Sequence, residues 1–140
     1  MIKNERQYII TKAQTRKFKE ALKKFEAETT ATHPLLIKAQ REALESQLAE
    51  LNAQLREYEK LRSGKPKKLK KSSFHRLPLE LIRARIARGL TQRDLAIRLG
   101  LKEQQIQRYE ETDYASASLA RINEVIRALD IEVREEVILS

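Results

Sequence analysis

The sequence predicts a mainly α-helical protein: a long N-terminal helical hairpin, a basic linker, and a C-terminal domain of short helices ending in a short β-strand. Two observations support this fold class. Only three Gly and three Pro occur in 140 residues, and these are the residues that most disfavour helices. Apolar residues also recur at helical spacing along most of the chain. We therefore expect three parts, at residues 1–62, 63–77 and 78–140.

The composition also limits the class of protein. The absence of cysteine excludes a disulfide framework and a thiolate metal site, and it fits a reducing cytoplasm. No apolar run approaches the ~18 residues that a membrane helix needs, and Met1 to Arg6 lack the apolar core of a signal peptide. We expect a cytoplasmic protein without a membrane partner, a metal or a cofactor.

The net charge of +9 is unevenly distributed. Residues 1–62 carry 13 basic and 9 acidic side chains, residues 63–77 carry 6 and 0, and residues 78–140 carry 10 and 11. The basic excess is therefore concentrated in the linker, and the C-terminal domain is close to neutral.

The first helix of the predicted hairpin spans residues 12–28. Thr11 and Gln14 form a capping-box pattern at its start, and the segment Tyr8 to Ile10 before it is too short to classify. An apolar stripe with the spacing i, i+4, i+7 follows, formed by Phe18, Leu22 and Phe25.

The second helix is predicted to begin at Pro34, with Thr32 or His33 near its cap, and to continue toward Gly64. The polar, β-branched segment at residues 28–33 separates the two helices. The apolar positions alternate by three and four residues and are interrupted only at Arg41; they are Ile37, Leu44, Leu48, Leu51, Leu55 and Tyr58.

A stripe of this length needs a partner helix, and the first helix is predicted to be only about half as long. A second copy of the chain would cover the rest, so we predict a homodimer through the hairpin. The predicted contact residues are Leu44, Leu48, Leu51, Leu55 and Tyr58. The alternative is a monomeric hairpin that packs on the C-terminal domain.

The predicted linker combines Gly64 and Pro66 with repeated positive charge from Lys65, Lys67, Lys68, Lys70 and Lys71. Two interpretations remain open. The linker is either a solvated tether, or a basic arm that lies along DNA phosphates or in a minor groove.

The C-terminal domain is predicted to open with a helix at Leu77 and Pro78. Arg83, Arg85 and Arg88 fall on its flanks, and its inward positions are Leu79, Ile82, Ile86 and Leu90.

Two short helices follow in close succession. Thr91 and Asp94 can cap the first, and Gly100 can end it in a left-handed conformation. The second has Ile106 and Tyr109 on its inner side. Two short helices joined by such a tight turn cross steeply, as in a helix-turn-helix.

The last predicted helix follows a polar loop, with Ser116 or Ser118 as its cap, and its inner residues are Leu119, Ile122, Val125, Ile126 and Leu129. Residues 131–139 then alternate well enough to predict a strand. This strand would pair with its symmetry mate, through Ile131 and Val133, with Tyr8 to Ile10, or with another protein.

Residues 79–129 resemble the helix-turn-helix domain of the xenobiotic-response-element family, which includes lambda-type repressors, Cro and HigA-like antitoxins. The residues that carry the resemblance are Arg85 to Gln92, Leu95-Ala96, Leu99 to Leu101, Ile106, Arg108 to Glu110 and the helix from Leu119 to Leu129. The resemblance does not extend to residues 1–62.

The resemblance implies that Gln92 contacts a DNA phosphate and that residues 103–110 form the recognition helix. The residues that would bind DNA are Gln92, Arg93, Lys102, Glu103, Gln104, Gln107 and Arg108, together with the five linker lysines. Gln suits adenine, Arg guanine and Glu cytosine. The sequence departs from the family at the cap, which is Lys102, and at Thr112 and Asp113, where family members have a glycine.

The resemblance implies a sequence-specific transcriptional regulator that binds double-stranded DNA as a dimer at a palindromic operator. It also fits an antitoxin that represses its own operon and holds a small toxin protein. The alternative is an assembly or adaptor protein that uses the hairpin for protein contacts. We expect no enzyme, because His33 and His75 lie in different parts and no catalytic motif is present.

Overall fold

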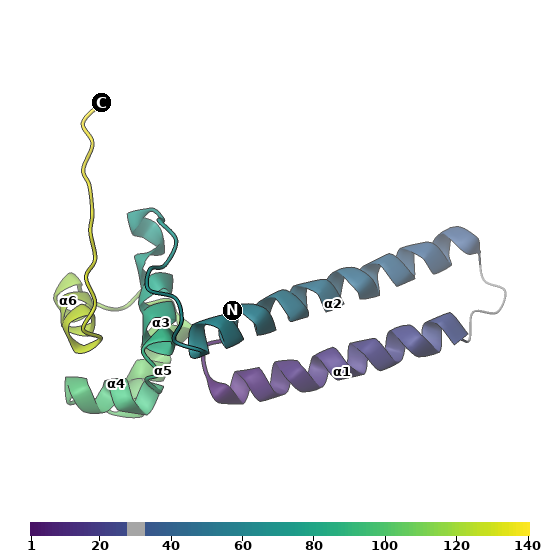
Figure 1. Cartoon of the computed structure of the whole chain (residues 1–140), viewed down its shortest axis with the longest axis horizontal. Helices are drawn as coiled ribbons and strands as arrows, with labels where there is room; N and C mark the ends of the chain where they lie inside the picture. The colour runs from purple at the N-terminus through teal and green to yellow at the C-terminus, as the bar shows by residue number, and fades with distance from the viewer. Residues whose placement is uncertain (28–32) are drawn as a thin grey trace. The chain divides into compact units, whose positions relative to one another are not determined.

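The fold is known from a computed structural model that describes residues 1–27 and 33–140 (Figure 1). The helices of the described residues are α1 Glu5–Ala27, α2 Pro34–Arg62, the short 3-10 helix η1 Phe74–Arg76, α3 Leu77–Ala87, α4 Gln92–Leu99, α5 Glu103–Glu111 and α6 Leu119–Ala128. The predicted mainly α-helical class is confirmed. None of these helices is long and apolar enough to cross a membrane.

The chain forms two compact units, Met1–Glu59 and Lys60–Ser140. Unit 1 is the hairpin of α1 and α2, and unit 2 holds the last residues of α2, the linker and the four C-terminal helices.

The start of α1 differs from the prediction. Asn4, not Thr11, caps the helix: the backbone N–H of Gln7 donates to Asn4 Oδ1 at 2.8 Å, and the Gln7 side chain accepts from the N–H of Lys3 at 2.8 Å. Thr11 lies in the helix interior, where its carbonyl accepts from the Thr15 hydroxyl at 2.9 Å. The prediction was wrong because Asn4 and Gln7 repeat the same capping pattern earlier in the chain.

The start of α2 at Pro34 agrees with the prediction. His33 precedes it, and its Nδ1 accepts a hydrogen bond from the N–H of Leu35 at 3.3 Å. Of the predicted break at residues 28–33, only His33 is described. The possible cap Thr32 lies outside the described residues.

Two tyrosines hold the hairpin together near the start of α1. The rings of Tyr8 and Tyr58 stack with centroids 5.1 Å apart. The Tyr8 hydroxyl donates to Glu59 at 2.5 Å, and the Tyr58 hydroxyl donates to Glu5 at 3.3 Å. Both rings and Leu55 are buried, so this end of the hairpin has a closed core.

The side chains between α1 and α2, which form the seam of the hairpin, are less buried at greater distance from the two tyrosines. Its side chains there are half-buried: Phe18, Leu22, Phe25, Ile37, Leu44, Leu48 and Leu51. With 23 residues against 29 for α2, α1 covers more of the stripe than predicted. Arg41 takes the predicted slot in the stripe, and its buried Nε has no hydrogen-bond partner among the described residues.

The linker of unit 2 is shorter than predicted, because residues 74–77 are helical. Pro78 lies in the first turn of α3, as predicted. The most deeply buried apolar side chains of this unit are Leu81, Ile82, Leu95, Ile106, Val125 and Leu129. Leu119 is 62% exposed, so its predicted inward position is wrong, and the inner face of α6 begins only at Ile122.

The predicted C-terminal strand is not seen in the single chain. Residues 131–140 form no regular structure. A strand needs a partner to form its backbone hydrogen bonds, and Tyr8 to Ile10 are unavailable because they are helical. Ile131 and Val133 are half-buried, whereas Val137, Ile138 and Leu139 are 79–92% exposed.

Candidate nucleic-acid interface

The first helix of the pair, α4, begins and ends as predicted. The N–H of Asp94 donates to Thr91 Oγ1 at 3.0 Å, and the N–H of Thr91 donates to Asp94 Oδ2 at 2.9 Å. The hydrogen bond from the Thr91 backbone holds the pKa of Asp94 below its ordinary value. Gly100 ends the helix with φ of 68°, in the left-handed region that favours glycine.

The second helix, α5, begins without a side-chain cap at Lys102, because an ammonium group cannot accept a hydrogen bond. Gln105 compensates in part: its side-chain oxygen accepts from the N–H of Lys102 at 2.9 Å. The departure at the cap therefore leaves the helix intact from Glu103 to Glu111.

A buried ionic network joins α3, α4 and α5. Arg85 and Glu110 pair through two bonds, Nε to Oε2 and Nη2 to Oε1, each 2.7 Å long. Arg85 also donates to the carbonyl of Leu90 at 2.8 Å, and Gln92 Nε2 donates to Glu110 at 3.0 Å. Arg85 is 2% exposed and Glu110 is 1% exposed. A buried pair is stable only when its other polar atoms also have partners, and this network supplies them.

This network was not predicted from the sequence. Arg85 was placed on the flank of its helix, and only Ile106 and Tyr109 were assigned to the inner side of the helix that holds Glu110. A signal was present, because Arg85 follows Ile82 by three residues and Glu110 follows Ile106 by four. Residues at these spacings share a helix face with the buried apolar residue, so both belong to inner faces.

Gln92 is the predicted site residue whose place differs most from expectation. It is 7% exposed, and its side-chain N–H₂ group is directed at Glu110. The predicted contact of Gln92 with a phosphate stays a prediction, and the exposed Arg93 also lies at the start of α4.

The outer face of α5 presents the predicted recognition residues. Glu103, Gln104 and Arg108 are exposed and Gln107 is half-buried. Their side chains form no hydrogen bond or ion pair with the other described residues, so their donors and acceptors remain available. These groups match the edges of bases in a major groove.

The segment after α5 contains the second departure from the family. Asp113, one of the two residues of this departure, and the following Tyr114 have left-handed φ values of 49° and 58°. The ring of Tyr114 stacks on Tyr109 with centroids 5.6 Å apart and is 3% exposed. Burial raises the pKa of Tyr114, which keeps its hydroxyl neutral. This packing offsets the strain of the left-handed pair.

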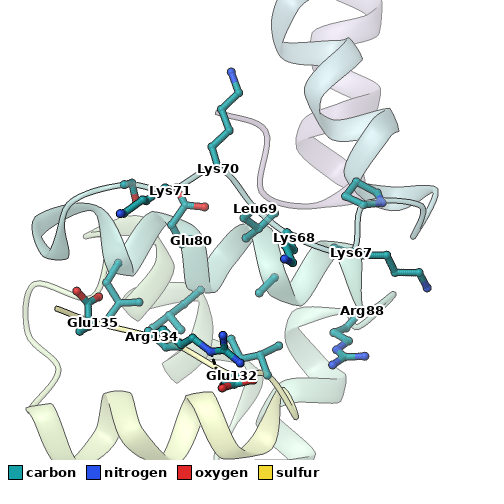
Figure 2. A pocket seen from close by; sticks show the side chains of 18 of the residues that line it. Lys67, Lys68, Leu69, Lys70, Lys71, Glu80, Arg88, Glu132, Arg134 and Glu135 are labelled. Atoms are coloured by element: carbon teal, nitrogen blue, oxygen red, sulfur yellow. Dashed lines mark hydrogen bonds and ion pairs between the residues drawn. The ribbon is translucent and has the colours of Figure 1, made fainter.

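The five linker lysines are exposed, whereas Pro66 and Leu69 are half-buried. The linker, α3 and residues 131–135 line a cleft of about 690 Å³ (Figure 2). Leu69 points toward α3, and Lys67 and Lys70 extend away from the cleft. Both lysines are exposed, and their role in a basic arm stays a prediction.

Two arginines of unit 2 are used within the fold. Arg98 Nη1 donates to the carbonyl of Ala128 at 2.8 Å, and Arg88 Nη2 donates to the carbonyl of Asp130. These carbonyls lie at the C-terminal end of α6, where cations are favourable. Neither arginine is therefore a simple surface charge.

The comparison with protein families agrees with this geometry. Residues 81–135 match the family model described as helix-turn-helix. This segment is therefore similar to a helix-turn-helix of the lambda repressor/Cro type. The match covers less than half of the chain. Searches of curated proteins and of solved structures gave no significant match.

The helix-turn-helix match indicates a DNA-binding regulator. Domains of this class are typically not enzymatic. Among the described residues, no group of three or more His, Asp or Glu side chains could hold a metal ion. The candidate interface comprises α5, the start of α4 and the linker lysines, and its contacts with DNA stay a prediction.

Proposed function

We propose that the protein is a sequence-specific transcriptional regulator that reads DNA with α5. The observation that carries this proposal is the contrast between the two sides of that helix. Glu110 on the inner side is fixed by Arg85 and Gln92, whereas Gln104 and Arg108 on the outer side are exposed. A fixed helix with available polar side chains is what direct readout of bases requires.

The linker supplies the non-specific part of the affinity. Residues 78–140 carry 10 basic and 11 acidic side chains, and Arg88 and Arg98 already bind carbonyl groups. Phosphate neutralisation dominates non-specific binding, so Lys65, Lys67, Lys68, Lys70 and Lys71 are its main source.

The protein acts as a dimer on a palindromic operator, with half-sites about one helical turn apart. The half-buried seam residues Leu44, Leu48 and Leu51 support an association through the hairpin. Leu55 and Tyr58, which the sequence analysis also included, are buried, so their role is to close the hairpin. Ile131 and Val133 line the cleft beside α3.

Within this function, the chain is an antitoxin that represses its own operon. The support is the presence of surfaces outside the helix-turn-helix that can hold a second protein. Val137, Ile138 and Leu139 are 79–92% exposed in an extended segment, and such a segment can add a strand to the sheet of another protein. The partner would be a small toxin encoded beside this chain.

DNA binding is tested by fluorescence anisotropy with the fragment upstream of the gene, over a range of salt concentrations. Arg108→Ala should lower affinity for that fragment by about 1–3 kcal/mol and reduce sequence preference. Lys67→Ala with Lys68→Ala should weaken binding to all DNA and lower the salt slope by about two.

The matched control is Lys19→Ala, which removes one positive charge from the exposed surface of unit 1 and should change neither quantity. Absent or salt-insensitive binding to the upstream DNA contradicts the regulator and favours the adaptor.

The antitoxin role is tested by purification of the full chain from native cells, followed by mass spectrometry. A small basic protein from the same operon should co-purify, and its expression alone should arrest growth. A solitary gene whose loss leaves growth unchanged contradicts this role.

A further inference from the structure

The basic linker begins at a turn with defined hydrogen bonds. The N–H of Gly64 donates to the carbonyl of Leu61 at 3.0 Å, and the Ser63 hydroxyl accepts from the N–H of Lys65 at 3.3 Å. Gly64 has a φ of 68°, in the left-handed region that favours glycine. The chain therefore enters the linker at Lys65 in a fixed direction.

This turn lies against the end of α3. A side-chain carbon placed on Gly64 would lie 3.5 Å from the carbonyl oxygen of Ala87, which is the last residue of α3. The chain then turns tightly, because the N–H of Leu90 donates to the carbonyl of Arg85 at 3.1 Å. The next residue, Thr91, caps α4. The linker therefore begins at the end of α3 that leads into α4.

The linker then runs back along α3 to its start. It begins beside Ala87 and ends at η1, which directly precedes Leu77. Pro66 and Leu69 are half-buried on the way, and Leu69 points toward α3 (Figure 2). Because α3 has 11 residues, its two ends are about 16 Å apart. The lysines are therefore distributed along the helix.

The two halves of the linker hold different lysines. Lys65, Lys67 and Lys68 follow the turn at the end of α3, whereas Lys70 and Lys71 precede η1 at its start. Figure 2 shows Lys67 and Lys71 at opposite ends of the cleft that the linker and α3 line. All five lysines are exposed, so they differ mainly in their place along α3.

The helix-turn-helix pair is attached to the same end of α3 as the first lysines. Arg85, in the last turn of α3, binds Glu110 of α5 at 2.7 Å. Gln92 of α4 donates to the same carboxylate at 3.0 Å. Both helices of the candidate interface are therefore fixed at the end of α3 where Lys65 and Lys67 lie.

We propose that the first three lysines of the linker, Lys65, Lys67 and Lys68, meet the DNA phosphates. The last two, Lys70 and Lys71, lie outside the contact. This inference rests on the proposed function and divides its linker lysines into two groups. Salt screens exposed charges over about 10 Å at 0.1 M, which is less than the length of α3. Because the linker is docked along α3, the last two lysines cannot swing to the phosphates that the first three meet.

The two groups are compared by fluorescence anisotropy of the full chain with a short duplex of mixed sequence, over a range of salt concentrations. Lys65→Ala with Lys67→Ala should lower the salt slope by about two, because two phosphate contacts are lost. The matched control is Lys70→Ala with Lys71→Ala, which removes the same charge from the same linker and should leave the slope nearly unchanged. Equal losses in the two double variants overturn the inference.

The docking of the linker is tested with Leu69→Ser, which replaces the side chain that points toward α3 and keeps every lysine. A released linker can bring either group to the phosphates, so in this background the two double variants should have similar slopes. Leu119→Ser is the matched control, because Leu119 is 62% exposed and lies outside the cleft; the difference should remain. A difference that also persists in Leu69→Ser contradicts docking as its cause. Circular dichroism checks that both variants remain helical.

A third measurement needs no substitution. Acetylation of the wild-type chain with and without the duplex, followed by mass spectrometry, reports how accessible each lysine is. DNA should lower the reactivity of Lys65 and Lys67 and leave that of Lys70 and Lys71 unchanged. The reference is Lys38 on the exposed surface of α2. Equal protection of both groups by DNA contradicts the division.

The outcomes separate this inference from the proposed function. A wild-type chain that binds DNA with equal contributions from both groups keeps the regulator and overturns the inference. A wild-type chain that binds neither the mixed duplex nor the upstream fragment contradicts the regulator itself, and with it the inference.

Discussion

The two units place charged groups in their interiors in different ways. In unit 2, Arg85 is 2% exposed, and its guanidinium binds Glu110 and the carbonyl of Leu90. In unit 1, Arg41 interrupts the apolar stripe of α2, and its buried Nε has no hydrogen-bond partner among the described residues. The buried Arg85 has defined partners within its unit, whereas the half-buried Arg41 interrupts an incompletely covered seam.

This difference shows what a completed core requires. An unpaired buried polar group is costly, and a paired one fixes the geometry of the elements that supply its partners. Unit 2 therefore has a defined arrangement of α3, α4 and α5, whereas the far half of the hairpin has an incomplete interior.

The largest expected effect is the loss of one partner in the buried network of unit 2. Glu110→Ala leaves Arg85 buried without its carboxylate and should destabilise unit 2 by about 3–5 kcal/mol. Hydrogen exchange with mass spectrometry should show faster exchange in α3 to α5 and unchanged exchange around Tyr8 and Tyr58. Equal loss of protection in both units would remove the distinction between them.

A double variant sharpens the same prediction. Arg85→Met with Glu110→Leu replaces both charges by apolar groups of similar size, and it should recover a large part of the stability that Glu110→Ala loses. If the double variant is as unstable as the single one, packing rather than an uncompensated charge explains the loss.

The tyrosine contact of unit 1 should have a smaller effect. Tyr8→Phe removes the hydrogen bond to Glu59 while keeping the ring stack on Tyr58. We expect a loss of about 1 kcal/mol, because Glu59 is exposed and water can replace the hydroxyl. Urea denaturation and hydrogen exchange of α1 measure this loss of stability. Hydrogen exchange in α5 should not change.

Arg41→Leu should have an effect of similar size and opposite sign. It removes the Nε that has no partner in the described part of the chain and restores the apolar stripe between Ile37 and Leu44, so it should stabilise the hairpin by about 1 kcal/mol. Differential scanning calorimetry should show a higher Tm. A lower Tm would indicate that the guanidinium has a partner in the folded protein in solution.

The smallest expected effect is a pH dependence in unit 2. The pKa of Asp94 is lowered by the Thr91 hydrogen bond, so the folded state binds this proton more weakly than the unfolded state does. The resulting stability is present above the unfolded pKa and is lost as the pH falls through the folded pKa. In Asp94→Asn, the decrease in Tm between neutral pH and about pH 3 should be smaller than in the wild type. An identical decrease would contradict a role for this carboxylate.

The elements that the sequence predicted correctly depend on local interactions. Thr91 and Asp94 are three residues apart, and the glycine that ends α4 follows the helix directly. Gln92, Arg85 and Glu110, by contrast, come from three helices, and no local pattern specifies that they meet. The inner faces could be predicted, but the partners could not.

The two main errors in the sequence analysis have different causes. Thr11 begins a valid capping pattern, but Asn4 offers another one earlier, and a helix gains backbone hydrogen bonds by starting there. The predicted terminal strand is not seen, because an alternating side-chain pattern does not provide the second strand with which it must pair. The DNA contacts of Gln104 and Arg108 stay predictions, because exposure alone does not identify a ligand.

The network of Arg85, Gln92 and Glu110 limits how α5 can adjust its position to a ligand. Because it ties α5 to α3 and α4, the outer face of α5 cannot shift or rotate independently to improve its fit to a ligand. The three helices must move as one rigid body, and the conformational entropy lost on binding falls mainly on exposed side chains and on the linker. Under the proposed function, selectivity would depend on side-chain rotamers such as those of Gln104 and Arg108, on a backbone that supplies a fixed template.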